Sequence, residues 1–225
     1  MARRRLNPHA LILPIEAERA IYIDFEGFKE KSPTLLGVLI EDNLEQVILD
    51  SALLPLANAR GHRVSTLAGE AYRLVQRSAD EKRLIVAYTQ HERKVLSTFA
   101  NTDIDEHYRD ARMIAKRWTN ALYPKASIKG RELKDFLKFI KFPRGAHLGY
   151  RKSTKRIRAA RDMIVRKGSY EALTAVAKAK WTKLLQHNAI DCRGMQALVR
   201  RAAKEMAARS PNSSTRSTGQ RPLGG

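Results

Sequence analysis

Two carboxylates, Asp24 and Glu26, stand two residues apart in a stretch that is otherwise apolar, β-branched or aromatic. Side chains two apart in a strand point to the same face, so these acids should lie side by side. Neighbouring carboxylates away from water repel each other, and a divalent cation with oxygen ligands relieves that repulsion. The pair therefore favours a Mg²⁺-type site. The sequence is equally compatible with a strand end at which both acids reach solvent beside Lys29 and Lys31.

A third acid, Asp191, lies on the apolar stripe of the last predicted helix, between Leu184 and Leu198. His187 precedes it by four residues and so lies one turn away on the same face. Aspartate is rarely buried without a partner, and a metal ion would serve as one. Arg193, a backbone N–H group or a nearby helix end would serve too, and a lone histidine there is more often packed than catalytic.

Glu92 follows an apolar strand and shares a helical face with Val95 and Phe99. Taken alone, it is better explained as a cap, because Thr89 and Glu92 have the spacing of a capping box. Taken together, the acids of the first strand, of this helix start and of the last helix would converge at one end of a sheet. Four carboxylates there could hold two divalent ions about 3.5–4 Å apart, the arrangement that hydrolyses phosphodiesters.

The elements that must position these acids alternate along the first half of the chain. The predicted strands are 20–26, 35–40, 46–49 and 84–88, and a turn at 41–44 joins the second and third into a hairpin. Helical spacing marks 67–76, 95–99, 111–118, 133–140, 154–166, 170–180 and 181–208, while 107–114 could hide a fifth strand. This order predicts a three-layer α/β fold with a central mixed sheet, an antiparallel hairpin, helices on both faces and a helical C-terminal half.

The chain carries 43 Lys and Arg against 23 Asp and Glu, a formal charge of +20. Residues 1–150 have a net charge of +6 and residues 151–225 a net charge of +14. Such an excess indicates a polyanionic partner, nucleic acid before membrane.

Eight of the seventeen residues of 151–167 are Lys or Arg, which predicts a helix with one basic side that grips a phosphate backbone. A merely solvated helix face is the alternative. The candidate contacts of this basic segment are Arg151, Lys152, Lys155, Arg156 and Arg158.

The single cysteine, Cys192, excludes a disulfide framework and a cysteine zinc site. No apolar run approaches the ~20 residues that span a bilayer, so we expect a cytoplasmic protein without membrane contact. We expect a basic extension at 1–17, one domain at 18–208 with a basic helical insertion at about 144–180, and a disordered low-complexity tail at 209–225.

Three segments resemble the motifs of the DEDD superfamily of 3′→5′ exonucleases, and of a little-characterised prokaryotic branch in particular. Residues 21–27 (Ile-Tyr-Ile-Asp-Phe-Glu-Gly) resemble the first motif, and residues 84–92 (Leu-Ile-Val-Ala-Tyr-Thr-Gln-His-Glu) the second. Residues 187–191 (His-Asn-Ala-Ile-Asp) are similar to the third. The resemblance spans about 18–205 and implies a ribonuclease H-like fold.

The resemblance also implies a nuclease that uses two Mg²⁺ or Mn²⁺ ions on DNA or RNA, at single-stranded 3′ ends. Its metal-binding acids match Asp24, Glu26, Glu92 and Asp191. His187 matches the residue that positions or deprotonates the attacking water, although it precedes the acid by four positions rather than five. Thr89 stands near a substrate contact where many members have Asn.

Two alternatives keep the same fold. One is a basic nucleic-acid-binding protein that is catalytically weak or inactive, and the other is an endonuclease. The sequence does not choose between DNA and RNA, and it leaves the oligomeric state open.

Overall fold

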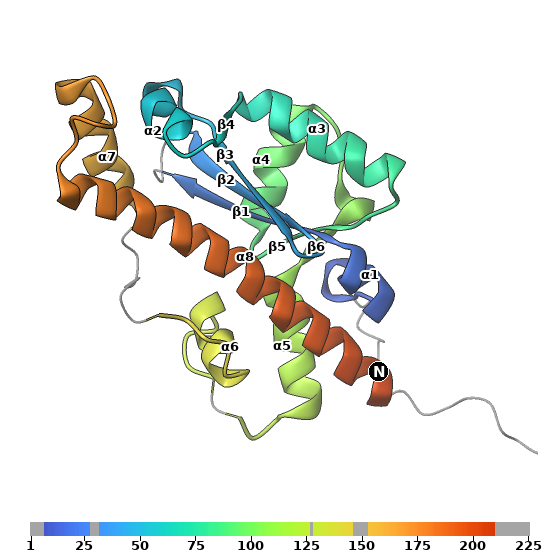
Figure 1. Ribbon diagram of the computed structural model, residues 1–225. Coiled ribbons are helices and arrows are strands. Elements are labelled where there is room, and N and C mark those ends of the chain that lie inside the picture. The colour runs from blue at the N-terminus through green and yellow to red at the C-terminus, as the bar shows by residue number, and fades with distance from the viewer. Residues whose placement is uncertain (1–6, 28–31, 127, 146–152, 210–225) are drawn as a thin grey trace, which may run out of the picture.

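A six-stranded mixed sheet lies at the centre of the molecule (Figure 1). The computed structural model describes residues 7–27, 32–126, 128–145 and 153–209. Its strands are β1 (Ile21–Gly27), β2 (Pro33–Ile40), β3 (Asn43–Ile48), β4 (Arg63–Val64), β5 (Ile85–Ala87) and β6 (Tyr108–Asp110). Their order is β4-β3-β2-β1-β5-β6: β1, β2 and β3 pair antiparallel, while β4, β5 and β6 join by parallel pairing. The predicted mixed sheet and its β2–β3 hairpin are confirmed.

Helices cover both faces of this sheet (Figure 1). They are α1 (Pro14–Arg19), α2 (Leu54–Asn58), α3 (Leu67–Asp80), α4 (Gln90–Ala100), α5 (Ala111–Leu122), α6 (Leu133–Phe139), α7 (Ser153–Lys167) and α8 (Ala175–Arg209). Because strand side chains alternate, Ile21 of β1 packs with Leu74 of α3 and Leu96 of α4 on one face. Tyr22 packs with Trp118 of α5 and residues of α8 on the other. The three-layer α/β architecture is therefore as the sequence predicts.

The last helix differs from the prediction. We expected separate helices at 170–180 and 181–208, but α8 is one helix of 35 residues that begins at Ala175. The hydroxyl of Thr174 accepts a hydrogen bond from the backbone N–H of Ala177 (3.2 Å), which satisfies a donor of the first turn. No glycine or proline stands at 175–193, so nothing ends the helix near residue 180.

The spacing of apolar residues also failed to predict the short elements. The ambiguous segment 107–114 contains the last residue of a short 3-10 helix (Asp105–His107), then β6, and then the first residues of α5. Helices α1 and α2 and the two-residue strand β4 were not predicted, because segments this short contain too few positions to show a period.

Helix α8 runs along one face of the sheet (Figure 1) and lies close to Gly37 of β2. A Cβ atom at Gly37 would lie 2.4 Å from Asn188 Oδ1 and 2.8 Å from Cys192 Sγ, so a larger residue would force these side chains or the helix to shift. Gly37 pairs with Asp24 in the β1–β2 ladder. The same contact therefore brings one turn of α8 over Asp24, in the middle of β1.

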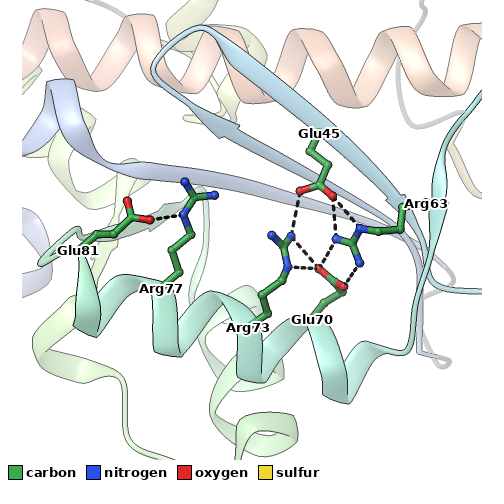
Figure 2. A network of polar contacts seen from close by, with 6 residues as sticks. All are labelled: Glu45, Arg63, Glu70, Arg73, Arg77 and Glu81. Atoms are coloured by element: carbon green, nitrogen blue, oxygen red, sulfur yellow. Dashed lines mark hydrogen bonds and ion pairs between the residues drawn. The ribbon is translucent and has the colours of Figure 1, made fainter.

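A polar network holds α3 against the β3–β4 edge of the sheet (Figure 2). Glu70 of α3 is 1% exposed and accepts hydrogen bonds from Arg63 (2.9 Å) and Arg73 (2.9 Å). Both arginines also contact Glu45 of β3, at 2.8 and 3.0 Å. Burial opposes ionisation of Glu70, but the arginine hydrogen bonds outweigh it and lower the pKa to about 2. This buried acid thus has a structural partner for its charge.

Candidate functional site

Three of the predicted site residues meet where β1 ends beneath α8. His187 Nε2 lies 3.4 Å from Asp191 Oδ2 and 3.7 Å from Glu26 Oε1. One potential ligand atom from each of the three residues falls within 4.8 Å of the others. We call Glu26, His187 and Asp191 the acid–histidine cluster. Its residues come from a strand end and from one helix face, as their spacing predicts.

Asp24 lies beside this cluster but is held by a different partner. Asn188 Nδ2 donates to Asp24 Oδ2 (2.9 Å) and to the Asp24 backbone carbonyl (3.0 Å). Gln46 of β3 donates to Asn188 Oδ1 (2.8 Å) and to the carbonyl of Leu185 (2.9 Å), which fixes the amide. The two acids of β1 thus share a face yet contact different residues of α8.

Glu92 lies in the first turn of α4 and forms the predicted cap. Its Oε2 atom accepts from the Thr89 hydroxyl (2.6 Å) and from the Thr89 backbone N–H (3.2 Å), which is the capping-box arrangement. The side chain is buried, and burial raises the pKa of Glu92 despite these hydrogen bonds. Its charge also acts on Asp24, so cap and site are neighbours. Thr89, the predicted substrate contact, is the N-cap residue itself.

Two partners of the cluster were not predicted. Arg144 Nη2 lies 3.1 Å from His187 Nδ1 and 3.6 Å from Asp191 Oδ1. The hydroxyl of Ser153, at the start of α7, donates to Glu26 Oε1 (3.0 Å). Neither residue belongs to a periodic pattern, so the sequence carries no signal for them. Asn188 did carry one, since it shares the stripe of Asp191.

The cluster resists ionisation. Burial raises the pKa of Glu26 to about 7, although the Ser153 hydrogen bond acts in the opposite direction. Burial also raises the pKa of Asp191 to about 6, against the nearby Arg144 charge. The pKa of Asp24 is raised well above its usual value by burial and then by the charges of neighbouring acids. The positive charges and hydrogen-bond donors around these carboxylates are therefore too few to stabilise all three in the ionised form.

His187 is neutral in this setting. Burial lowers the pKa of its imidazole to about 4, and the positive charges of Arg144 and Arg156 act in the same direction. A neutral imidazole near pH 7 can bind a metal ion or accept a proton, because one ring nitrogen keeps its lone pair.

The basic helix α7 divides its cations between two sides. Lys155 and Arg158 are exposed, as a phosphate grip requires. Arg156 is only 6% exposed, and its guanidinium donates to the carbonyl of Lys183 (3.5 Å). It therefore lies on the packed side of α7 and not beside the two exposed cations. Two further predicted contacts, Arg151 and Lys152, lie outside the described residues.

Comparison of the chain with protein-family models, with curated proteins and with solved structures found no match. Among the helices of the described residues, none is both long enough and apolar enough to cross a membrane. The chemistry of the site must therefore be inferred from its own residues.

Proposed function

We propose that this protein is a metal-dependent nuclease that hydrolyses phosphodiester bonds of DNA or RNA, acting as a 3′→5′ exonuclease of the DEDD type. The observation that carries the proposal is the acid–histidine cluster, with Asp24 beside it on the same strand face. The buried structural acid Glu70 has two arginine partners that lower its pKa, whereas Arg144 beside Asp191 does not bring the pKa of Asp191 down to its usual value. The acids of the site have raised pKa values, and perturbed pKa values of this kind are typical of functional sites.

The donor set fits a divalent ion. Carboxylate oxygens suit Mg²⁺ and Mn²⁺, and an imidazole nitrogen is compatible with Mn²⁺. Glu26 and Asp191 would hold the ion, with Asp24 and the adjacent Glu92 as the remaining acids. The chemistry that such an ion supplies when bound is a lowered pKa of water and stabilisation of the leaving oxygen.

The protein's own groups prepare this site in three ways. Asn188 and Gln46 hold the Asp24 carboxylate in one orientation through consecutive hydrogen bonds. Thr89 holds Glu92 at the start of α4. His187, whose imidazole is neutral, directs Nε2 toward the carboxylates, where it can bind the ion or orient a water molecule.

The motif resemblance supports the same function. The three motifs supply acids from β1, from the start of α4 and from α8, in the order that the DEDD superfamily has them. The mixed sheet with its antiparallel hairpin agrees with the ribonuclease H-like fold that the resemblance implies. The second-motif acid is Glu92 where the superfamily usually has an aspartate, and its side chain is held in a capping box.

A polyanionic substrate is supported by two groups of cations. Besides Lys155 and Arg158, a second group lies near the end of β5, where Arg112 Nε and the Tyr88 hydroxyl both donate to the carbonyl of Arg131 (3.2 and 3.0 Å). Lys116, one turn from Arg112 on α5, has its pKa lowered by burial and by these two arginines. Cations gathered this closely favour binding of a phosphate backbone.

The test is digestion of 5′-labelled linear and circular DNA and RNA with Mg²⁺, Mn²⁺ or EDTA. We expect a metal-dependent ladder that shortens from the 3′ end, reduced at least ~100-fold in Asp24→Asn and Asp191→Asn. Asp162→Asn, which makes the same change at an exposed acid of α7, should digest at the wild-type rate. Cleavage of the circular substrates would mean that the protein is an endonuclease and not an exonuclease. Binding of nucleic acid without digestion would mean that the protein is a nucleic-acid-binding protein and not a nuclease.

A further inference from the structure

We propose that Arg144 is a tethered cation that occupies the acid–histidine cluster in the metal-free protein and must withdraw before a divalent ion binds there. The inference rests on the proposed metal site and adds a device that controls its loading. Arg144 would make the protein bind its metal more weakly than the carboxylates alone allow.

The contacts place the Arg144 guanidinium where a metal ion would compete with it. Its Nη2 atom reaches both His187 Nδ1 (3.1 Å) and Asp191 Oδ1 (3.6 Å), so it neutralises part of the cluster. Arg144 Nε is buried and, within the part of the chain that the structure describes, has no hydrogen-bond partner. A buried unpaired N–H group is unfavourable, so attraction to the cluster must offset its desolvation.

Hydrogen-bonding roles make the two cations mutually exclusive at His187. A guanidinium only donates, so Nδ1 of the neutral ring accepts and Nε2 carries the hydrogen. That hydrogen points toward Glu26 and Asp191 and prevents Nε2 from binding a metal. A ring that binds metal through Nε2 carries its hydrogen on Nδ1, where it would face another donor. Binding of a metal ion by His187 Nε2 therefore requires the Arg144 guanidinium to move away from His187 Nδ1.

Arg144 is placed so that it can leave. Residues 142–145 belong to no helix or strand, so the guanidinium can move without breaking an element. Arg156, the other arginine near the cluster, lies within α7 and donates to the carbonyl of Lys183. The structure thus combines one fixed cation with one displaceable cation.

The test is Mn²⁺ binding by titration calorimetry to the full chain at pH 7.5. We expect Arg144→Gln to bind Mn²⁺ about tenfold more tightly or better, since a positive charge 3.6 Å from Asp191 Oδ1 is removed. Arg144→Lys should stay near the wild-type Kd. The matched control is Arg200→Gln, which removes a partly buried arginine that pairs with Glu18 (2.9 Å), and its Kd should change less than twofold.

An equal or weaker affinity in Arg144→Gln would overturn the inference while leaving the proposed nuclease intact. Absence of Mn²⁺ binding from wild type and both Arg144 variants, with Asp191→Asn no different, would overturn the metal site itself. A second readout is the ¹⁵N spectrum of the His187 ring, identified by its loss in His187→Gln. It should show hydrogen on Nε2 without metal, and hydrogen on Nδ1 there would contradict the Arg144 contact.

Discussion

Asn188 donates its side-chain amide to both the carboxylate and the backbone carbonyl of Asp24, at 2.9 and 3.0 Å, although the two residues are 164 positions apart. Gln46 in turn donates to Asn188, so β1, β3 and α8 are joined by consecutive side-chain contacts. The helix reaches this position because it passes directly over Gly37. The orientation of Asp24 therefore depends on how closely α8 approaches the sheet.

Gly37→Ala should disturb the site and the fold together. The added Cβ would lie 2.4 Å from Asn188 Oδ1, so the amide or the helix must shift. We expect a loss of about 1–3 kcal/mol in the free energy of unfolding, measured by urea denaturation, together with weaker Mn²⁺ binding. Gly69→Ala is the control, because the nearest atom to a Cβ there is the Thr66 hydroxyl at 3.1 Å, and Gly69 lies in α3, away from the site. Wild-type stability and affinity in Gly37→Ala would mean that α8 does not need this close approach.

Glu26→Gln should stabilise the metal-free protein at high pH. Burial raises the pKa of Glu26 from 4.5 to about 7, so the folded wild type binds this proton more tightly than the unfolded chain does. Wild type therefore loses stability as the pH rises from about 4.5 to about 7, and glutamine, which cannot ionise, does not.

We expect Glu26→Gln to exceed wild type by about 1–3 kcal/mol at pH 8 in EDTA, and to match it near pH 4. Urea denaturation at both pH values measures this. Added Mn²⁺ should reverse the order at pH 8, because only wild type keeps the carboxylate ligand. A variant less stable than wild type at pH 8 in EDTA would show that other groups of the protein stabilise the negative charge of Glu26 without a metal ion.

Glu70→Gln should have the opposite effect on stability. The arginine hydrogen bonds shown in Figure 2 outweigh burial and hold the pKa of Glu70 at about 2. The stabilisation is complete above the unfolded pKa of about 4.5 and is lost as the pH falls toward 2. We expect Glu70→Gln to cost about 1–3 kcal/mol at pH 7, with a smaller cost at pH 3. Mn²⁺ affinity should stay unchanged, and a change in it would connect this network to the site.

Removal of the exposed α7 cations should weaken the salt dependence of nucleic-acid binding. In the double variant Lys155→Gln/Arg158→Gln, the slope of log K against log salt should fall by about 0.7 for each phosphate of a single strand that the protein no longer neutralises. The control, Lys82→Gln/Lys204→Gln, removes the same charge from exposed positions on the turn after α3 and on α8. Equal slopes in the two double variants would mean that α7 contributes only general charge.

The sequence predicted those features that depend on neighbours within one element. Period-two alternation indicated β1 and its acid pair, and helical spacing brought His187 and Asp191 onto one face of α8. The hairpin and the Glu92 cap are also local, and both are present in the structure. It did not predict elements of only a few residues, such as α2 and β4.

Contacts between distant segments were decided by tertiary structure alone. Helical spacing could not show that Arg156 would be buried while Lys155 and Arg158 are exposed, because the packed side of α7 depends on where α8 lies. Nor could any local pattern show that Arg144 would meet His187 across 43 positions. Periodicity records which way a side chain points from its own element, whereas the partner depends on how the elements pack. The sequence therefore determined which residues could do chemistry, and packing decided which of them meet.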